Sequence, residues 1–240
     1  MEKLKLPPPL VGCLICHSEG TLIRSEGRRV LNIGSDHPVV TCSKCGAVAT
    51  LDWTETEPDQ WQIRYRKIPR FAPYSYAVQR FGKPGWLESE DALDASTDVY
   101  IQRERLQQVQ RGELKWLKPA QLTPPPPLMN ADEVVYLAIK PVTYAKTAPP
   151  GLFSFTRESN ILDTGTFYLT DSKVHLLGQR RDRSHRLAEI SRLTHDEHGW
   201  EIHVGSGDDL HHYRGQYQDG ILNGELIIAI VEVLKQSARE

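Results

Sequence analysis

Short stretches of alternating apolar and polar residues dominate the first 68 residues of the chain. The clearest is Trp61–Arg66, which has the period of two that a half-buried β-strand requires. Shorter strand candidates precede it and are separated by turn residues such as Asp36 and Pro38. These candidates are Arg29–Ile33, Val39–Cys42 and Ala47–Trp53. The pattern predicts a small antiparallel sheet.

The pattern changes to a helical period between residues 69 and 128. Ser89–Gln110 is the strongest helix candidate, because Val99, Leu106 and Val109 fall on one face of a helix with 3.6 residues per turn. Four consecutive prolines, Pro124–Pro127, follow and favour a stiff, extended segment. We therefore interpret residues 69–128 as a helical and proline-rich connector between two domains.

From residue 129 onward, short strand candidates recur at regular spacing, and one helix candidate ends the chain. The strand candidates are Val134–Ile139, Gly151–Thr156, a hairpin over Gly165–Leu177, Leu187–Leu193, Trp200–Val204 and Leu210–Tyr213. The helix candidate is Gly224–Ser237, with apolar residues along one side and Asn223 as its N-cap. Many short strands separated by turn residues predict a small β-barrel or β-sandwich, followed by one amphipathic helix.

This C-terminal pattern resembles the pleckstrin-homology-like superfold, which includes GRAM and bacterial pleckstrin-homology-like domains. The resemblance rests on Asp132–Val134, which begins a first strand, and above all on Gly165–Thr170 and Lys173–Leu176. These last two segments form a glycine, an apolar strand ending in threonine, a polar turn and a second apolar strand. It covers roughly residues 130 to 237. It implies a domain that binds phosphoinositides, peptides or proteins and that rarely catalyses a reaction.

All the cysteines of the chain lie within its first 45 residues, as two C-x-x-C pairs. Each pair can form a tight turn whose two sulfurs face one point, and two such turns supply four thiolates for a tetrahedral Zn²⁺ ion. Gly46 suits the sharp turn after the second pair. Four thiolates also bind iron, so zinc and iron both stay open at this point. The predicted ligands of the structural zinc ion are Cys13, Cys16, Cys42 and Cys45.

Two cysteine turns on antiparallel strands, followed by a third strand, resemble the zinc-ribbon family over roughly residues 11 to 68. Zinc ribbons occur in transcription factors, polymerase subunits, ribosomal proteins and adaptors, so the resemblance implies a metal more than a function. The predicted fold class is α+β, mostly β. It comprises a zinc ribbon at residues 1–68, a connector at 69–128 and a pleckstrin-homology-like β-barrel at 129–240, closed by a C-terminal helix.

The net charge of −2 and the pI of about 6.5 create no global positive field, so any anion site must be local. One basic group is interleaved with aromatic residues and is an alternative site for single-stranded nucleic acid: Arg64, Arg66, Lys67 and Arg70. A second group is predicted to lie in a loop and is an alternative site for anions or lipid: Arg180, Arg181, Arg183 and Arg186. We favour the simpler interpretation of both groups as solvated cations on a strand face and at a hairpin tip.

Further sequence features argue against membrane-spanning and catalytic roles. No apolar run reaches the roughly 18 residues that span a bilayer, and no signal peptide is apparent, which predicts a cytoplasmic protein. Phosphate-loop, dinucleotide-binding, nucleophile-elbow and H-E-x-x-H motifs are absent from the sequence. The histidines His195, His198, His211 and His212 are interpreted as surface residues.

We therefore predict a non-catalytic, zinc-binding adaptor or scaffold that docks on a protein partner or a larger assembly. Nucleic-acid binding through the basic strand is the first alternative. Peripheral membrane binding through the pleckstrin-homology-like domain is the second. No small-molecule substrate is inferred.

Overall fold

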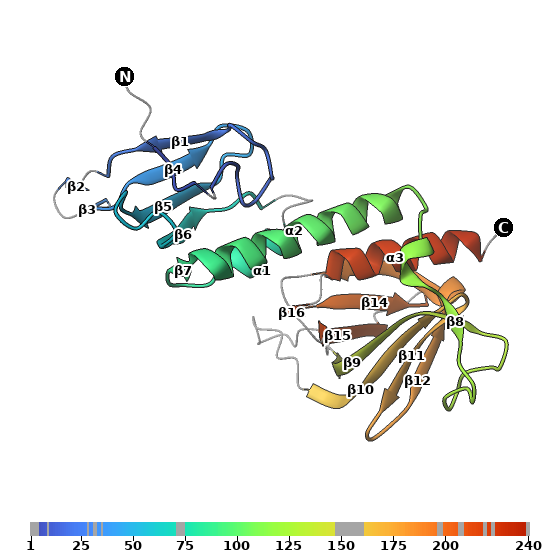
Figure 1. The fold of residues 1–240 in the computed structure, drawn as a ribbon. Helices are drawn as coiled ribbons and strands as arrows, with labels where there is room; N and C mark the ends of the chain where they lie inside the picture. Colours follow the sequence, from blue (N-terminus) through green and yellow to red (C-terminus); the bar gives the residue numbers. More distant parts are fainter. Residues whose placement is uncertain are drawn as a thin grey trace. The chain divides into compact units, whose positions relative to one another are not determined.

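A computed structural model of the chain describes residues 5–8, 10–27, 29–30, 33–34, 36–70, 75–146, 161–195, 199–205, 209–217, 220–221 and 224–238. The described structure is mostly β with three α-helices, which confirms the α+β class (Figure 1). It forms two compact units, Met1–Glu104 and Arg105–Glu240, and each has its own apolar core. The division into three parts at residues 68 and 128 stays a prediction.

Unit 1 contains an antiparallel five-stranded sheet with the order β1-β4-β5-β6-β7. Its strands are β1 (Leu22–Ser25), β4 (Val39–Cys42), β5 (Val48–Trp53), β6 (Trp61–Lys67) and β7 (Leu87–Glu88). A separate pair is formed by β2 (Arg29–Val30) and β3 (Ile33–Gly34). The strands predicted around the second cysteine pair and at Trp61 are confirmed. Strand β1 was not predicted, because it alternates over only four residues.

One face of this sheet builds the core of unit 1. The cross-strand pairs Leu51–Ile63 and Trp53–Trp61 lie on that face, and Leu51, Ile63 and Trp61 are almost fully buried. Helix α1 (Ser75–Phe81) and the first part of helix α2 (Ser89–Gln110) add side chains to the same core. The bounds predicted for α2 are confirmed, whereas α1 is too short for its period to be recognised in the sequence.

Unit 2 contains a nine-stranded antiparallel sheet. Its main path is β12-β11-β10-β9-β15-β14-β13, with β8 beside β9 and β16 beside β15. The strands are β8 (Ala120–Gln121), β9 (Val134–Lys146), β10 (Ile161–Thr170), β11 (Lys173–Gly178), β12 (Arg183–Arg186), β13 (Ile190–His195), β14 (Trp200–Val204), β15 (Asp209–Tyr217) and β16 (Gly220–Ile221). Two short 3₁₀ helices, η1 (Lys115–Leu117) and η2 (Leu187–Glu189), complete the unit.

The sheet of unit 2 is open, so the predicted closed barrel is not supported. In the part of the chain that the structure describes, the pairing path ends at β12 on one side and at β13 on the other. The 3₁₀ helix η2 lies between these two strands along the chain; its Leu187 is buried in the core, and the Glu189 carboxylate accepts the Arg186 backbone N–H. The strand predicted over Leu187–Leu193 therefore begins only at Ile190.

Helix α3 (Gly224–Ser237) packs its apolar side into the core of unit 2, as predicted. The side chains of Ile227, Ile230 and Val231 are at most 2% exposed and share the core with Phe167 and Trp200. The second part of α2 adds Leu106 and Val109 to this core. The predicted N-cap Asn223, the strand Gly151–Thr156 and His198 lie outside the described residues.

Candidate metal centre

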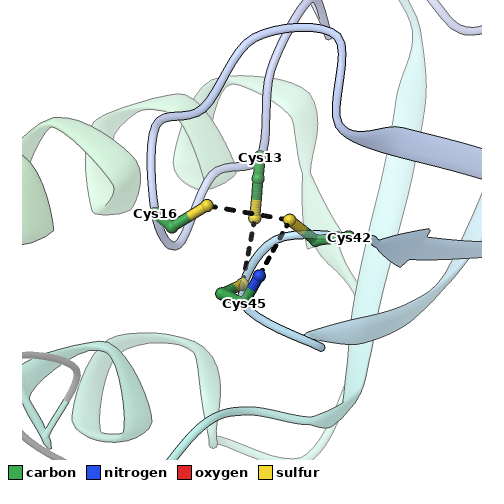
Figure 2. A group of neighbouring side chains, drawn as sticks. All are labelled: Cys13, Cys16, Cys42 and Cys45. Carbon is green, nitrogen blue, oxygen red and sulfur yellow. Dashed lines mark hydrogen bonds between the residues drawn. The ribbon is translucent and has the colours of Figure 1, made fainter.

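The four cysteines converge on one point in unit 1 (Figure 2). Cys13 and Cys16 come from a turn before β1, whereas Cys42 ends β4 and Cys45 lies in the turn before β5. All four sulfur atoms lie within 4.8 Å of one another, and Cys13, Cys16 and Cys42 are buried. The sequence prediction that these cysteines form one site is confirmed, and the site could hold one metal ion.

The distances between the sulfurs fit a metal better than disulfides. The Cys13–Cys45 and Cys16–Cys42 Sγ–Sγ distances are both 3.7 Å, whereas a disulfide bond measures about 2.05 Å. A tetrahedral ion with metal–sulfur bonds of about 2.3 Å places its ligands about 3.8 Å apart. The donor set therefore suits one tetrahedral ion, and it would accept zinc or iron.

The backbone of both cysteine turns repeats one motif. The His17 N–H donates to the Cys13 carbonyl at 2.8 Å, and the Gly46 N–H donates to the Cys42 carbonyl at 3.0 Å. Both donors have left-handed backbone conformations, with φ of 56° at His17 and 75° at Gly46. Glycine takes this conformation without strain, whereas histidine takes it at a cost. The contacts that compensate at His17 come from helix α2.

Burial and local hydrogen bonds shift the pKa values of the thiols in opposite directions. Burial raises the pKa of Cys13 and raises that of Cys45 to about 11. Burial would also raise the pKa of Cys42, but the Cys45 backbone N–H and the Thr21 hydroxyl hydrogen-bond its sulfur and lower that pKa to about 6. Since metals bind thiolates, a cation bound at this point would favour the thiolate form of all four cysteines.

Helix α2 contacts the first cysteine turn through polar groups. Ser96 Oγ donates to the Leu14 carbonyl at 2.9 Å, and Arg103 Nη1 donates to the Cys16 carbonyl at 3.0 Å. The His17 ring lies edge-on to Tyr100 with 5.2 Å between centroids. Burial and the nearby Arg103 lower the pKa of His17, which favours a neutral ring. His17 thus lies beside the site, between the first cysteine turn and α2.

His37 lies in different surroundings. Its ring is 4.9 Å from that of Trp86, and its Nδ1 is 3.6 Å from an Asp52 carboxylate oxygen. Neither His17 nor His37 belongs to the group of side chains that converge as candidate metal ligands in the described residues.

The basic residues predicted as a possible nucleic-acid site are exposed on and after β6: Arg64, Arg66, Lys67 and Arg70. The aromatic residues of β6, Trp61 and Tyr65, alternate with Arg64 and Arg66 and so lie on the other face of the strand. Trp61 is 1% exposed in the core of unit 1, and the Tyr65 ring packs against Phe81 with 5.0 Å between centroids. The alternation that suggested base stacking therefore places these two rings against the protein.

The second basic group is not a single loop. Arg183 and Arg186 begin and end strand β12, while Arg180 and Arg181 lie in the turn before it. Asp163 organises this turn, because its buried carboxylate accepts the backbone N–H groups of Arg180 and Arg181 and the Arg183 guanidinium, at 2.9–3.1 Å. Burial opposes ionisation of Asp163, but these donors lower its pKa to about 2. Arg183 is thus neutralised within the protein, whereas Arg180, Arg181 and Arg186 are exposed.

Sequence reasoning missed a buried carboxylate in unit 2. Glu133, 4% exposed, accepts hydrogen bonds from Lys173 Nζ at 2.6 Å and from His175 Nε2 at 2.7 Å. The Thr170 hydroxyl lies 3.1 Å from its second oxygen. These donors are contributed by residues about 40 positions away along the chain, so no local motif signals the cluster.

The prediction that His211 and His212 lie on the surface is wrong, since both are 5% exposed. They occupy adjacent positions of β15, whose two faces are both covered at this point. His211 Nδ1 lies 3.0 Å from the Tyr144 hydroxyl, and His212 Nδ1 lies 3.2 Å from a Glu201 carboxylate oxygen. Alternation of residues along a strand does not reveal that both of its faces are buried. His195, at the end of β13, is exposed as predicted.

Comparison with protein-family models and with curated proteins finds no match to this chain. Within the described ranges, none of the helices is long and apolar enough to cross a membrane. The functional interpretation therefore rests on the geometry of the four cysteines and of the two units.

Proposed function

We propose that the protein is a non-catalytic adaptor whose N-terminal module is a zinc ribbon. The observation that carries this proposal is the convergence of the four cysteine sulfurs at distances that suit one tetrahedral ion. Four thiolates complete the coordination of zinc, leaving no position for a reacting water, so the ion is structural. Its role is to join the turn that carries Cys13 to the β4–β5 hairpin and so to stabilise a small module. Four cysteines that converge as metal ligands instead of forming disulfides suit a reducing compartment, so the proposal includes a cytoplasmic location.

We further propose that unit 2 is a pleckstrin-homology-like domain. Two features support the proposal: sequential antiparallel pairing within β9–β12 and β13–β15, and the pairing of β15 back onto β9. Helix α3 covers the apolar core between these strands. The polar groups buried in this unit also support a binding role over catalysis, because Glu133 and Asp163 are both saturated by donors that hold strands together.

A groove in unit 2 supports docking of a protein segment. Its volume is about 610 Å³, which is within the range of pockets that bind ligands. Apolar walls come from Leu114, Tyr136 and Leu234, and charges of opposite sign come from Lys115 and Asp171. A groove lined by apolar side chains and by charges of both signs suits an extended polypeptide better than a single ion.

The nucleic-acid alternative is favoured by the four exposed cations of β6 and the segment after it. Binding of this kind would weaken steeply with salt, because each phosphate contact releases counterions. The membrane alternative draws on Arg180, Arg181 and Arg186, which are exposed. It predicts attachment to anionic vesicles that is lost when these arginines become glutamates.

The test is capture with the tagged full-length chain from its own cell extract, compared with the Lys115→Glu variant. Lys115 is exposed, so this change alters the groove and leaves the fold intact. The proposal predicts a stoichiometric protein partner that the wild type retains and the variant loses. Capture of nucleic acid, sensitive to salt and equal for both chains, would replace the adaptor proposal by the first alternative.

A further inference from the structure

Two hydrogen bonds attach helix α2 to the backbone of the first cysteine turn. Ser96 Oγ donates to the Leu14 carbonyl, and Arg103 Nη1 donates to the Cys16 carbonyl, seven residues further along the helix. Both acceptors belong to the segment that carries Cys13 and Cys16. Their directions therefore depend on how that turn is folded.

His17 adds a third contact at the same turn. Its left-handed backbone, with φ of 56°, points the ring at α2, where it lies edge-on to Tyr100 and 3.4 Å from Ser96 Oγ. The Arg103 guanidinium lies 5.5 Å from the centre of the Tyr100 ring, so the side chains of His17, Tyr100 and Arg103 form one contact layer. In this layer His17 has a backbone conformation that is unfavourable for a residue other than glycine.

Apolar packing and charge balance also join helix α2 to the first cysteine turn. Ala92, Ala95 and Val99 of α2 are at most 3% exposed and share one core with Leu14 and Ile15. A zinc ion with four thiolates carries a net charge of −2, which the guanidinium at the Cys16 carbonyl partly balances.

Besides the buried side chains of Leu14 and Ile15, the first turn is held by less strand pairing than the second turn. The described residues beside it form one isolated β-bridge, Gly12–Glu19, whereas the second turn joins two paired strands, β4 and β5. Loss of the ion would leave four thiols in contact with no bond between them. The first turn would then relax, and the acceptors for Ser96 and Arg103 would move.

We propose that the metal ion controls the docking of helix α2: with metal bound, residues 92–103 are held on the first cysteine turn, and without it they are released. The proposal rests on metal binding at the four cysteines and goes beyond a purely stabilising role. Release exposes the stripe formed by Ala92, Ala95 and Val99, so metal occupancy decides whether this apolar surface is available.

The test is hydrogen–deuterium exchange of the full-length protein, loaded with zinc and then stripped by a chelator. We expect the amides of residues 92–103 to exchange at least tenfold faster in the stripped protein, with little change in β5, β6 and the strands of unit 2. Metal analysis of both samples distinguishes a failure of the coupling from a failure of the metal site itself. One zinc per chain with unchanged exchange in α2 overturns the coupling alone, whereas a chain that binds no zinc overturns the metal site and the coupling together.

A variant keeps the proposal testable if the stripped protein unfolds as a whole. Arg103→Met removes the donor to the Cys16 carbonyl and keeps an apolar side chain of similar length. The matched control is Arg105→Met, because Arg105 lies over the Trp116 ring instead of at the cysteine turn. With zinc bound to both, Arg103→Met should speed exchange in residues 92–103 about tenfold and release zinc faster to a chelator. Equal behaviour of the two variants, or equal loss of protection in β5, β6 and α2, would overturn the proposal.

Discussion

Replacing Glu133 by glutamine tests whether one buried carboxylate holds three strands of unit 2 together. Glu133 lies directly before β9 and accepts hydrogen bonds from Lys173 and His175 of β11, beside Thr170 at the end of β10. Burial alone would raise the pKa of Glu133, but the Lys173 and His175 hydrogen bonds lower it to about 2. Glutamine keeps the shape of the side chain but removes its negative charge. Its amide NH₂ group then faces hydrogen-bond donors in place of a carboxylate oxygen.

The expected loss of stability follows from the same contacts. Lowering the pKa of Glu133 from 4.5 to about 2 corresponds to about 3 kcal/mol of folding free energy at neutral pH. Removing one partner from a buried ion pair costs about 3–5 kcal/mol, and the 20% exposure of the Lys173 side chain favours the lower end. A loss of about 3 kcal/mol should lower the unfolding midpoint of unit 2 by roughly 10 °C.

Calorimetry of the full-length chain measures this midpoint, with Asp132→Asn as the control. Asp132 is the exposed neighbouring carboxylate, and its substitution should change the free energy of unfolding by less than about 0.5 kcal/mol. Because the folded pKa of Glu133 is the lower one, its contribution is present above pH 4.5 and is lost as the pH falls toward 2. The difference between wild type and Glu133→Gln should therefore shrink over that range. A loss below about 1 kcal/mol at pH 7 would refute the proposed role of Glu133.

Three further variants test other parts of the interpretation. Gly165→Ala should destabilise unit 2 by about 2–3 kcal/mol in thermal unfolding, because the new Cβ would lie 2.0 Å from the Leu177 carbonyl oxygen; an unchanged midpoint would contradict the β10–β11 register. Gly46→Ala should cost about 1–2 kcal/mol at a φ of 75° and speed zinc loss to a chelator, and equal retention would show that this turn tolerates a side chain. Arg64→Glu with Arg66→Glu should preserve the fold and partner capture, since both residues are exposed; loss of a salt-sensitive complex would favour nucleic-acid binding.

The features that sequence reasoning predicted are those with a strong local signal. The bounds of α2 and α3 are as predicted, because each helix carries buried apolar residues at helical spacing over at least 14 positions. The metal site was predicted from the spacing of its ligands alone. Each C-x-x-C pair determines a turn, and two turns with no other cysteine in the chain leave one way to combine them.

The features that were missed depend on contacts between distant residues. In the sequence, Glu133 is an acidic residue directly before a strand. Only the folded structure brings Lys173 and His175 of β11 to its carboxylate. His211 and His212 alternate like residues of a half-exposed strand, yet both sides of β15 are covered. The strand pattern also does not show whether the two end strands of a sheet pair, and in the described residues the pairing path ends at β12 and at β13.

The most direct test of the metal centre is elemental analysis of the purified full-length protein together with X-ray absorption at the metal edge. The proposed site predicts one zinc ion per chain with four sulfur neighbours at about 2.3 Å. A Cys42→Ser, Cys45→Ser double variant should lose that ion, whereas His37→Ala should retain it, because the described contacts of His37 are with Asp52 and Trp86. One iron per chain with four sulfurs would keep the site and contradict zinc, and a wild-type chain that holds no metal would contradict the centre itself.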